Sequence, residues 1–344
     1  MSTQVAMVWK GRDDDARLFA STFDGTSWTD QQVAGMGATS GGPALANVEG
    51  LPGFPSQTLF MAWKGFQDDP GLWWSSAGRA GGSWRSQQPA EATFRTSHGP
   101  ALAVGARKLM MAWRGSTGVS RFSKESQIHR IGRETKVTEM HRLPGTPPDP
   151  GQDGRLLWSI FDGASWFERQ IVGAAAPESS HAPALAGTGT QAVMAWKGNG
   201  SEPRLSWSLF DGRSWSNPQL VARGSVGTSD RPALALFQGR VYMAWKGEGN
   251  DSKIWWSSLH EGQWEAQQSV ADGGVGTSHG PALAVVDGKL ILAWKGKGND
   301  SKLWWSVYSG APPWSDQTQV TSRGGVGYET SHGPALASFR VFDL

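Results

Sequence analysis

Histidine recurs at a fixed place in a repeated phrase, and its imidazole can transfer protons, exchange hydrogen bonds and bind metals. The phrase Thr-Ser-His-Gly-Pro-Ala-Leu-Ala is complete at residues 96–103, 277–284 and 330–337. With its variant forms it occurs six times. Its third position holds His98, His181, Asp230, His279, His332 and, in the remaining copy, Gly41. These four histidines and Asp230 are the catalytic candidates if the protein is an enzyme.

Four imidazoles around one opening suit a metal ion, a set of turn caps, or a ligand site repeated in each unit. Metal-bound histidines usually have carboxylates that orient their rings, and none stands at a fixed place beside these phrases. We therefore predict no metal and no cofactor. Capping of the turn by serine and histidine and membership of a repeated ligand site both remain open.

A second phrase, Trp-Lys-Gly or Trp-Arg-Gly, also occurs six times. The two phrases together supply hydroxyls, imidazoles, indoles and cations, a combination that suits the apolar faces and hydroxyl groups of a sugar. The simpler interpretation of Lys295 is a surface ion pair with Asp300. The candidate ligand-binding residues are Trp9, Trp63, Thr96, Ser97, His98, Trp113, Ser180, His181, Trp196, Ser229, Asp230, Trp245, Thr277, Ser278, His279, Trp294, Lys295, Ser331 and His332.

The spacing of these phrases divides the chain into six units. Five are continuous, and the sixth is split between the two ends of the chain, which indicates an array closed into a ring. The units are 39–95, 96–178, 179–227, 228–276, 277–329, and 1–38 with 330–344. Each unit contains four short apolar runs separated by hairpin signals such as Asp-Gly. We therefore predict one all-β domain, a six-bladed β-propeller of four-stranded blades closed by pairing the C-terminal inner strand with N-terminal outer strands.

The 20 tryptophans fit this scheme, because six end the second strand, eight lie on the third and six open the fourth. Most should pack between blades. Small Pro-Ala-Leu-Ala residues suit the crowded innermost strand. Strand alternation places the Thr-Ser-His loop and the Lys-Gly turn on one rim of the ring.

Residues 116–150 interrupt the sixfold pattern on that same rim, in the second full blade. The segment is long enough to be either disordered or a functional lid.

Composition limits the other possibilities. A net charge of +2 argues against a nucleic-acid partner, and no run of apolar residues could span a membrane. The absence of cysteine and of an apolar leader leads us to expect a cytoplasmic protein. Neither a phosphate-binding loop nor a nucleophile elbow is present, so enzymatic activity is uncertain and the balance is against it. Assembly into a homo-oligomer is compatible with the sequence.

The phrases Ala-Trp-Lys-Gly-x-Gly-Asn-Asp-Ser, Trp-Trp-Ser and Gly-Val-Gly-Thr-Ser-His-Gly-Pro-Ala-Leu-Ala resemble those of bacterial β-propeller lectins of the Photorhabdus type. The resemblance covers nearly the whole chain except 116–150. It implies binding of fucose and related sugars between blades, by Thr277, Ser278, His279, Trp294 and their counterparts. That family has seven blades, whereas this chain has six units, as in fungal fucose-specific lectins with a different motif.

Two functions follow. The first is a multivalent lectin that binds glycans at several equivalent sites near the rim. The alternative is a propeller recruited as an enzyme, for example a cyclase, which holds a small apolar molecule in a tryptophan-lined central channel beneath residues 116–150.

Overall fold

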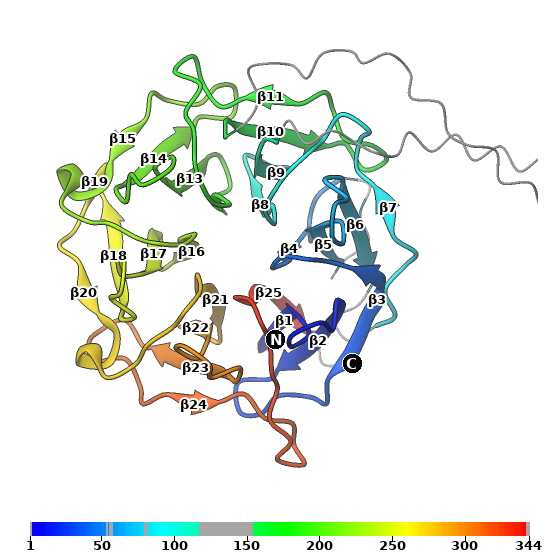
Figure 1. Ribbon diagram of the computed structural model, residues 1–344, viewed down its shortest axis with the longest axis vertical. Helices are drawn as coiled ribbons and strands as arrows, with labels where there is room; N and C mark the ends of the chain where they lie inside the picture. The colour runs from blue at the N-terminus through cyan, green and yellow to red at the C-terminus, as the bar shows by residue number, and fades with distance from the viewer. Residues whose placement is uncertain (1, 53, 55–57, 79–81, 117–153, 342–344) are drawn as a thin grey trace, which may run out of the picture.

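The computed structural model describes residues 2–52, 54, 58–78, 82–116 and 154–341, whose strands form six antiparallel sheets arranged in a ring (Figure 1). The fold is a six-bladed β-propeller, as predicted. Beyond Ser116, the insertion expected at 116–150 lies outside the described residues, and so does the lid assigned to it. The described residues contain no helix that is long and apolar enough to cross a membrane.

Each sheet runs from an inner strand at the axis to an outer strand at the rim of the ring. Three sheets are β25 (Ala335–Val341), β1 (Ser2–Lys10), β2 (Arg17–Phe23), β3 (Gln32–Ala38); β4 (Ala44–Asn47), β5 (Leu59–Lys64), β6 (Leu72–Ala77), β7 (Gln88–Pro89); and β8 (Ala101–Gly105), β9 (Lys108–Arg114), β10 (Leu156–Phe161), β11 (Gln170–Ile171). The others are β12 (Ala184–Gly187), β13 (Ala192–Lys197), β14 (Leu205–Phe210), β15 (Gln219–Leu220); β16 (Ala233–Phe237), β17 (Arg240–Lys246), β18 (Ile254–His260), β19 (Gln263–Trp264), β20 (Gln268–Ser269); and β21 (Ala282–Val286), β22 (Lys289–Lys295), β23 (Leu303–Tyr308), β24 (Thr318–Gln319). Two 3₁₀ turns, η1 (Val221–Gly224) and η2 (Val270–Gly273), follow β15 and β20.

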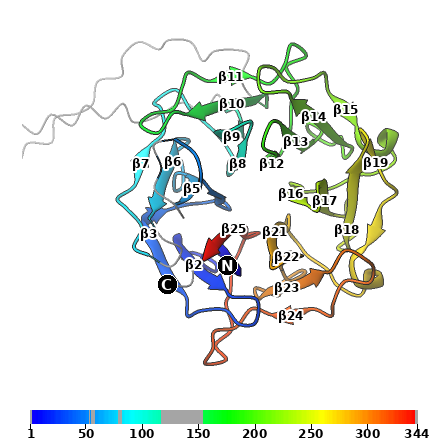
Figure 2. The ribbon, with the colours of Figure 1, turned by 180° about the vertical axis from the view of Figure 1, so that it is seen from behind.

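The ring closes through the two ends of the chain. Strand β25 pairs with β1 in an antiparallel register that runs from Ser2 opposite Val341 to Val8 opposite Ala335. From behind, β25 in red lies beside the blue N-terminal strands (Figure 2). The last strand of the chain is therefore the inner strand of the sheet that its first strands form, as predicted.

Crowding at the axis explains the glycines that precede the inner strands. A Cβ atom on Gly99 would lie 2.1 Å from the carbonyl oxygen of Gly42 in the neighbouring blade, and one on Gly333 would lie 2.1 Å from that of Gly280. Both distances are far below van der Waals contact. Only glycine lets the backbones of adjacent blades approach this closely.

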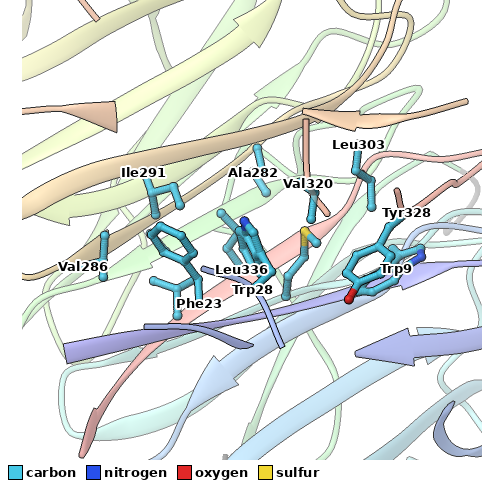
Figure 3. Packing of buried hydrophobic residues seen from close by; sticks show 14 of the residues in the cluster. Trp9, Phe23, Trp28, Ala282, Val286, Ile291, Leu303, Val320, Tyr328 and Leu336 are labelled. Atoms are coloured by element: carbon cyan, nitrogen blue, oxygen red, sulfur yellow. The ribbon is translucent and has the colours of Figure 1, made fainter. Parts of the chain in front are cut away.

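The hydrophobic core lies between the blades. At the interface between the split blade and the blade of β21–β24, Trp9, Phe23 and Trp28 pack against Ile291 and Tyr328 (Figure 3). The Trp9 and Tyr328 rings stack with their centroids 5.2 Å apart. Since each large aromatic ring buries roughly 150–250 Å², these contacts fasten one blade to the next.

The fourth strands differ from the prediction. Four of the six tryptophans expected to open them, including Trp28 and Trp215, instead form isolated bridges to the end of the third strand, and Trp264 ends β19 opposite Leu259 of β18. In five blades the chain then pairs again over only two residues, as in β15, whereas β3 has seven residues. A bulky ring that turns into the blade interface interrupts the ladder, which sequence alternation alone does not reveal.

Removing residues 335–344 should unfold the protein, because it deletes an inner strand and exposes the edge of β1. Loss of the β-sheet circular dichroism signal and a shift to aggregates in size-exclusion chromatography would be the expected results. As a control, a permuted chain that joins residue 344 to residue 1 by a short linker and begins at Thr39 keeps every strand and should fold. A folded, monomeric truncated protein would contradict this closure.

Candidate ligand-binding site

The two repeated phrases meet on one rim, as strand alternation predicted. Thr277, in the loop that enters β21, forms a β-bridge with Gly296, in the turn that follows β22. Ser278 Oγ donates a hydrogen bond of 3.0 Å to the carbonyl oxygen of Gly296. The loop before the inner strand and the turn after the second strand are thus held together within each blade.

A buried lysine fixes this arrangement. Lys295 Nζ lies 3.0 Å from Ser278 Oγ and donates to the carbonyl oxygens of Gly296, Gly298 and Asp300 at 3.4, 3.1 and 3.0 Å. Burial lowers the pKa of Lys295, although the nearby Asp300 carboxylate opposes that shift. Lys10, Lys64, Lys197 and Lys246 make the equivalent contacts in four other blades.

The expected surface ion pair between Lys295 and Asp300 is wrong. The ammonium meets the backbone oxygen of Asp300, while the carboxylate accepts hydrogen bonds from Trp304 Nε1 at 2.8 Å and from Lys302 N at 3.0 Å. The carboxylate therefore holds the next strand in place and leaves the lysine to the turn.

The threonines of the phrase are structural in this geometry. Thr277 Oγ1 donates to the carbonyl oxygen of His279 at 2.8 Å and accepts from its backbone N–H at 3.1 Å. The backbone N–H of Thr277 donates to Ser252 O, 2.8 Å away in the preceding blade. Thr277 and Thr96 have no exposed surface, so they offer a ligand no direct contact.

The six tryptophans of the second phrase are likewise buried. Their exposed fractions lie between 0 and 2%, and they fill the interfaces between blades. A ligand at the rim therefore does not reach them, and they do not line a central channel. They are Trp9, Trp63, Trp113, Trp196, Trp245 and Trp294.

The residues at the third position of the first phrase, unlike these threonines and tryptophans, are available to a ligand. All six copies converge on the axis. They line one polar hollow of about 280 Å³ at the mouth of the central channel, which we call the axial basin. Its lining includes Gly41, His98, His181, Asp230, His279 and His332, with Ser40 and Ser97 beside them. The copies therefore form one shared site, whereas the sequence suggested one separate site in each blade. Because serine, glycine, histidine, aspartate and arginine line it, the apolar channel expected for the enzyme alternative is not what the described residues form.

Each imidazole is oriented by the preceding serine. The Ser278 Oγ atom contacts Lys295 Nζ, the Gly296 carbonyl oxygen and, at 3.1 Å, His279 Nδ1. The ammonium can only donate, and the hydroxyl's single proton points to the carbonyl, so Nδ1 must donate to the hydroxyl. In the neutral ring Nε2 is then an unprotonated acceptor. The same contacts give the same tautomer for His181 and His332.

The serine beside His98 has a different cationic partner. Arg114 stands in the lysine position of this blade and donates to Ser97 Oγ, which lies 2.9 Å from His98 Nδ1. Among the described residues no carbonyl accepts the Ser97 proton, so the contacts of this exposed serine do not assign the His98 tautomer. The basin therefore presents three imidazoles of one tautomer, those of His181, His279 and His332.

Sequence reasoning missed Arg231. The other copies have glycine or alanine at this place, and the deviation of a single copy was the available signal. Arg231 extends across the axis, where Nη2 donates to the carbonyl oxygens of Gly333 and Pro334 at 3.2 and 3.0 Å. Its guanidinium therefore forms part of the lining of the basin.

The surroundings keep the histidines neutral. Burial, then the neighbouring imidazole and nearby cations, lower the pKa of His98 and His332 from 6.5 to about 4. Burial also lowers the pKa of His181 and His279, against the charge of Asp230. The ring centroids of His98 and His181 lie 5.5 Å apart, and those of His279 and His332 lie 5.6 Å apart. No three or more His, Asp or Glu residues in the described ranges are grouped closely enough to hold a metal ion.

A second hollow, also of about 280 Å³, lies between two blades, where β15 and η1 face β19. We call it the interblade hollow. Two indoles, Trp207 and Trp264, and two amides, Gln219 and Gln263, line it together with Arg223. Arg223 has φ of +57°, in the left-handed region that non-glycine residues rarely adopt, and the preceding Ala222 has φ of +45°. This backbone places a cation beside aromatic surface, and no repeated phrase pointed to it.

Comparison with known proteins supports the fold. No protein-family model matches the chain, and no curated protein matches it. Among solved structures, AofleA from Arthrobotrys oligospora has a TM-score of 0.59 and 10% identity, covering 99% of this chain and 90% of that one. A single-residue variant of Aleuria aurantia lectin, in complex with α-methyl-L-fucoside, has a TM-score of 0.54, 10% identity and coverage of 94% and 98%. SapL1 lectin in complex with α-methyl fucoside has a TM-score of 0.54, 11% identity and coverage of 92% and 96%. At these identities the likeness is one of fold.

Lys295 and its equivalents are enclosed by backbone oxygens, and we call them the caged lysines. Replacing one of them tests its structural role. Lys295→Met should lower the free energy of unfolding by about 2–4 kcal/mol, because it leaves Ser278 Oγ and three carbonyl oxygens without a charged donor. Lys297→Met, at an exposed position two residues away, is the matched control and should change stability by less than about 0.5 kcal/mol. Chemical denaturation measures both, and equal effects would contradict the assigned role.

The neutral histidines predict a specific loss of stability in acid. The unfolded chain takes up protons near pH 6.5, while folded His98 and His332 resist protonation until about pH 4. Their contribution to stability is therefore complete above pH 6.5 and disappears as the pH falls to about 4. After screening by water in the basin, we expect about 1–2 kcal/mol from each.

The measurement is the melting temperature between pH 4 and 7. A double variant, His98→Gln with His332→Gln, should flatten the profile relative to the natural protein. His260→Gln, at an exposed strand end, should leave the profile unchanged. A double variant with the same acid slope as the natural protein would refute this origin.

Proposed function

We propose that this protein is a carbohydrate-binding lectin and that its sugars are of the fucose type. The observation that carries the proposal is the interblade hollow, where two indoles, two amides and one guanidinium converge. Sugars bind where aromatic surface meets a few fixed hydrogen-bond donors and acceptors. The fold supports the same proposal, since two of the similar structures are lectins in complex with fucosides.

The proposed binding is polar on one side and apolar on the other. The guanidinium of Arg223 donates to ring or hydroxyl oxygens, and Gln219 and Gln263 supply both donors and acceptors. Trp207 and Trp264 are only 5% and 8% exposed, so they offer ring edges to the sugar. The C–H faces of a deoxy sugar such as fucose suit that narrow apolar wall.

The proposed sites are not equivalent around the ring. At the interface next to the split blade, Arg323 is paired with Asp24, with Nη2 3.0 Å from Oδ2. That guanidinium is engaged by protein, whereas no side-chain partner of Arg223 is present among the described residues. We therefore infer that the Arg223 hollow is the strongest site and that multivalent binding relies on weaker ones.

A glycan array with the full-length protein tests this function, with fucosylated glycans as the expected ligands. Arg223→Ala should reduce binding of α-methyl-L-fucoside by about 10- to 100-fold, the loss of one charge-assisted hydrogen bond. Arg213→Ala, at an exposed hairpin, is the matched control and should bind normally. Folded protein that binds no glycan would end the proposal, and unchanged binding by Arg223→Ala would move the site elsewhere.

A further inference from the structure

The axial basin has two faces of different chemistry. His181, His279 and His332 line its wall with Nδ1 held by the preceding serine, which leaves Nε2 without a partner among the described residues. Arg231 also lines the basin. Because the imidazole nitrogens accept hydrogen bonds and the guanidinium is a cationic donor, a ligand that uses both must carry two kinds of group.

Arg231 provides the cationic part. Only Nη2 has hydrogen-bond partners among the described residues, the two carbonyl oxygens of Gly333 and Pro334. The N–H groups on Nε and Nη1 are left for another acceptor. A charged group in such an enclosed position is normally matched by an anion, and arginine is the side chain best suited to bind a carboxylate.

The wider field at the basin is positive. Asp230 is the acid that acts on all four histidines, and one of its oxygens already accepts the Arg231 backbone N–H at 2.6 Å. Against it stand Arg231 and the caged cations behind the serines. They are Lys10, Lys64, Arg114, Lys197, Lys246 and Lys295. An excess of cations around a recessed opening attracts a negatively charged ligand.

The imidazoles that line the basin favour a different part of the ligand, its hydroxyl groups. Unprotonated Nε2 atoms repel a bare anion but accept hydrogen bonds from hydroxyl groups. The hollow of about 280 Å³ is near the lower end for ligand pockets and suits a single sugar ring. A simple inorganic anion would leave these acceptors unused.

We propose that the axial basin binds one sugar acid, with its carboxylate on the Arg231 guanidinium and its hydroxyls donating to the histidine Nε2 atoms. This inference goes beyond the proposed function, because the basin is a single site on the axis and shares no residue with the interblade hollow. It also explains why one copy of the repeat replaces the small residue after the third position by arginine.

Three probes separate the two kinds of contact: D-glucuronate, D-glucose and acetate, titrated into full-length protein by calorimetry. Glucuronate should bind with a dissociation constant on the order of 1 mM, as expected for a small polar ligand. Its affinity should exceed those of glucose and acetate by about ten-fold or more. In long-range ¹H–¹⁵N spectra of the imidazoles, glucuronate should shift the Nε2 signals of His181, His279 and His332.

Arg231→Gly is the main variant, since glycine stands at this place in four other copies and the inner strands already accommodate it. It should abolish the preference for glucuronate over glucose. If its melting temperature falls, Gly41→Phe gives an independent test by filling the basin. A Cβ at Gly41 meets its nearest neighbour, Gly99 N, at 3.5 Å, an ordinary contact. That variant should not bind glucuronate.

Arg223→Ala must leave glucuronate binding unchanged, which separates the two proposals. If a variant loses fucoside binding and retains glucuronate binding, the result bears on the interblade hollow alone. The basin proposal is overturned if glucuronate binds no better than glucose and acetate, if it shifts no imidazole signal, or if folded Arg231→Gly keeps the preference.

Discussion

The caged lysine is the interaction on which the rest of the rim depends. Its ammonium binds the carbonyl oxygens of a tight turn and the serine hydroxyl of the loop that enters the inner strand. A charge in this buried place is tolerated because backbone dipoles surround it. The serine that it holds then determines which imidazole nitrogen keeps a proton. One cation therefore links backbone architecture to the chemistry presented at the axis.

The positions at which one repeat differs from the others determine the chemistry of the site. Four copies of the phrase give four imidazoles, while Gly41 leaves one side of the basin without a side chain, and Asp230 with Arg231 adds both charges. Similarly, Arg114 in place of lysine gives the serine beside one histidine a guanidinium partner. Repetition builds the ring and its core, and single substitutions give its open surfaces their chemical character.

The sequence was sufficient to predict the fold because each blade corresponds to one sequence repeat. The split unit predicted the pairing of β25 with β1, and alternation predicted a common rim for Ser278 and Lys295. The sequence was insufficient to predict the site, because a motif does not reveal whether its side chains are buried. Trp294 looked like a sugar platform but lies wholly inside an interface. Arg223 was overlooked because it lies outside the two repeated phrases and its position depends on left-handed backbone. Arg231 was overlooked because it replaces the small residue in a single copy of the first phrase, and its role depends on convergence at the axis.

The pairing of β25 with β1 also bears on the order of synthesis. Strand β1 is made before its hydrogen-bonding partner β25, and the strands of five other blades lie between them in the chain. Those blades can fold as they are made, whereas the sheet of β1 keeps one edge unpaired until β25 is available. A chain terminated before β25 therefore retains an unpaired strand edge, by which chaperones and proteases can distinguish it.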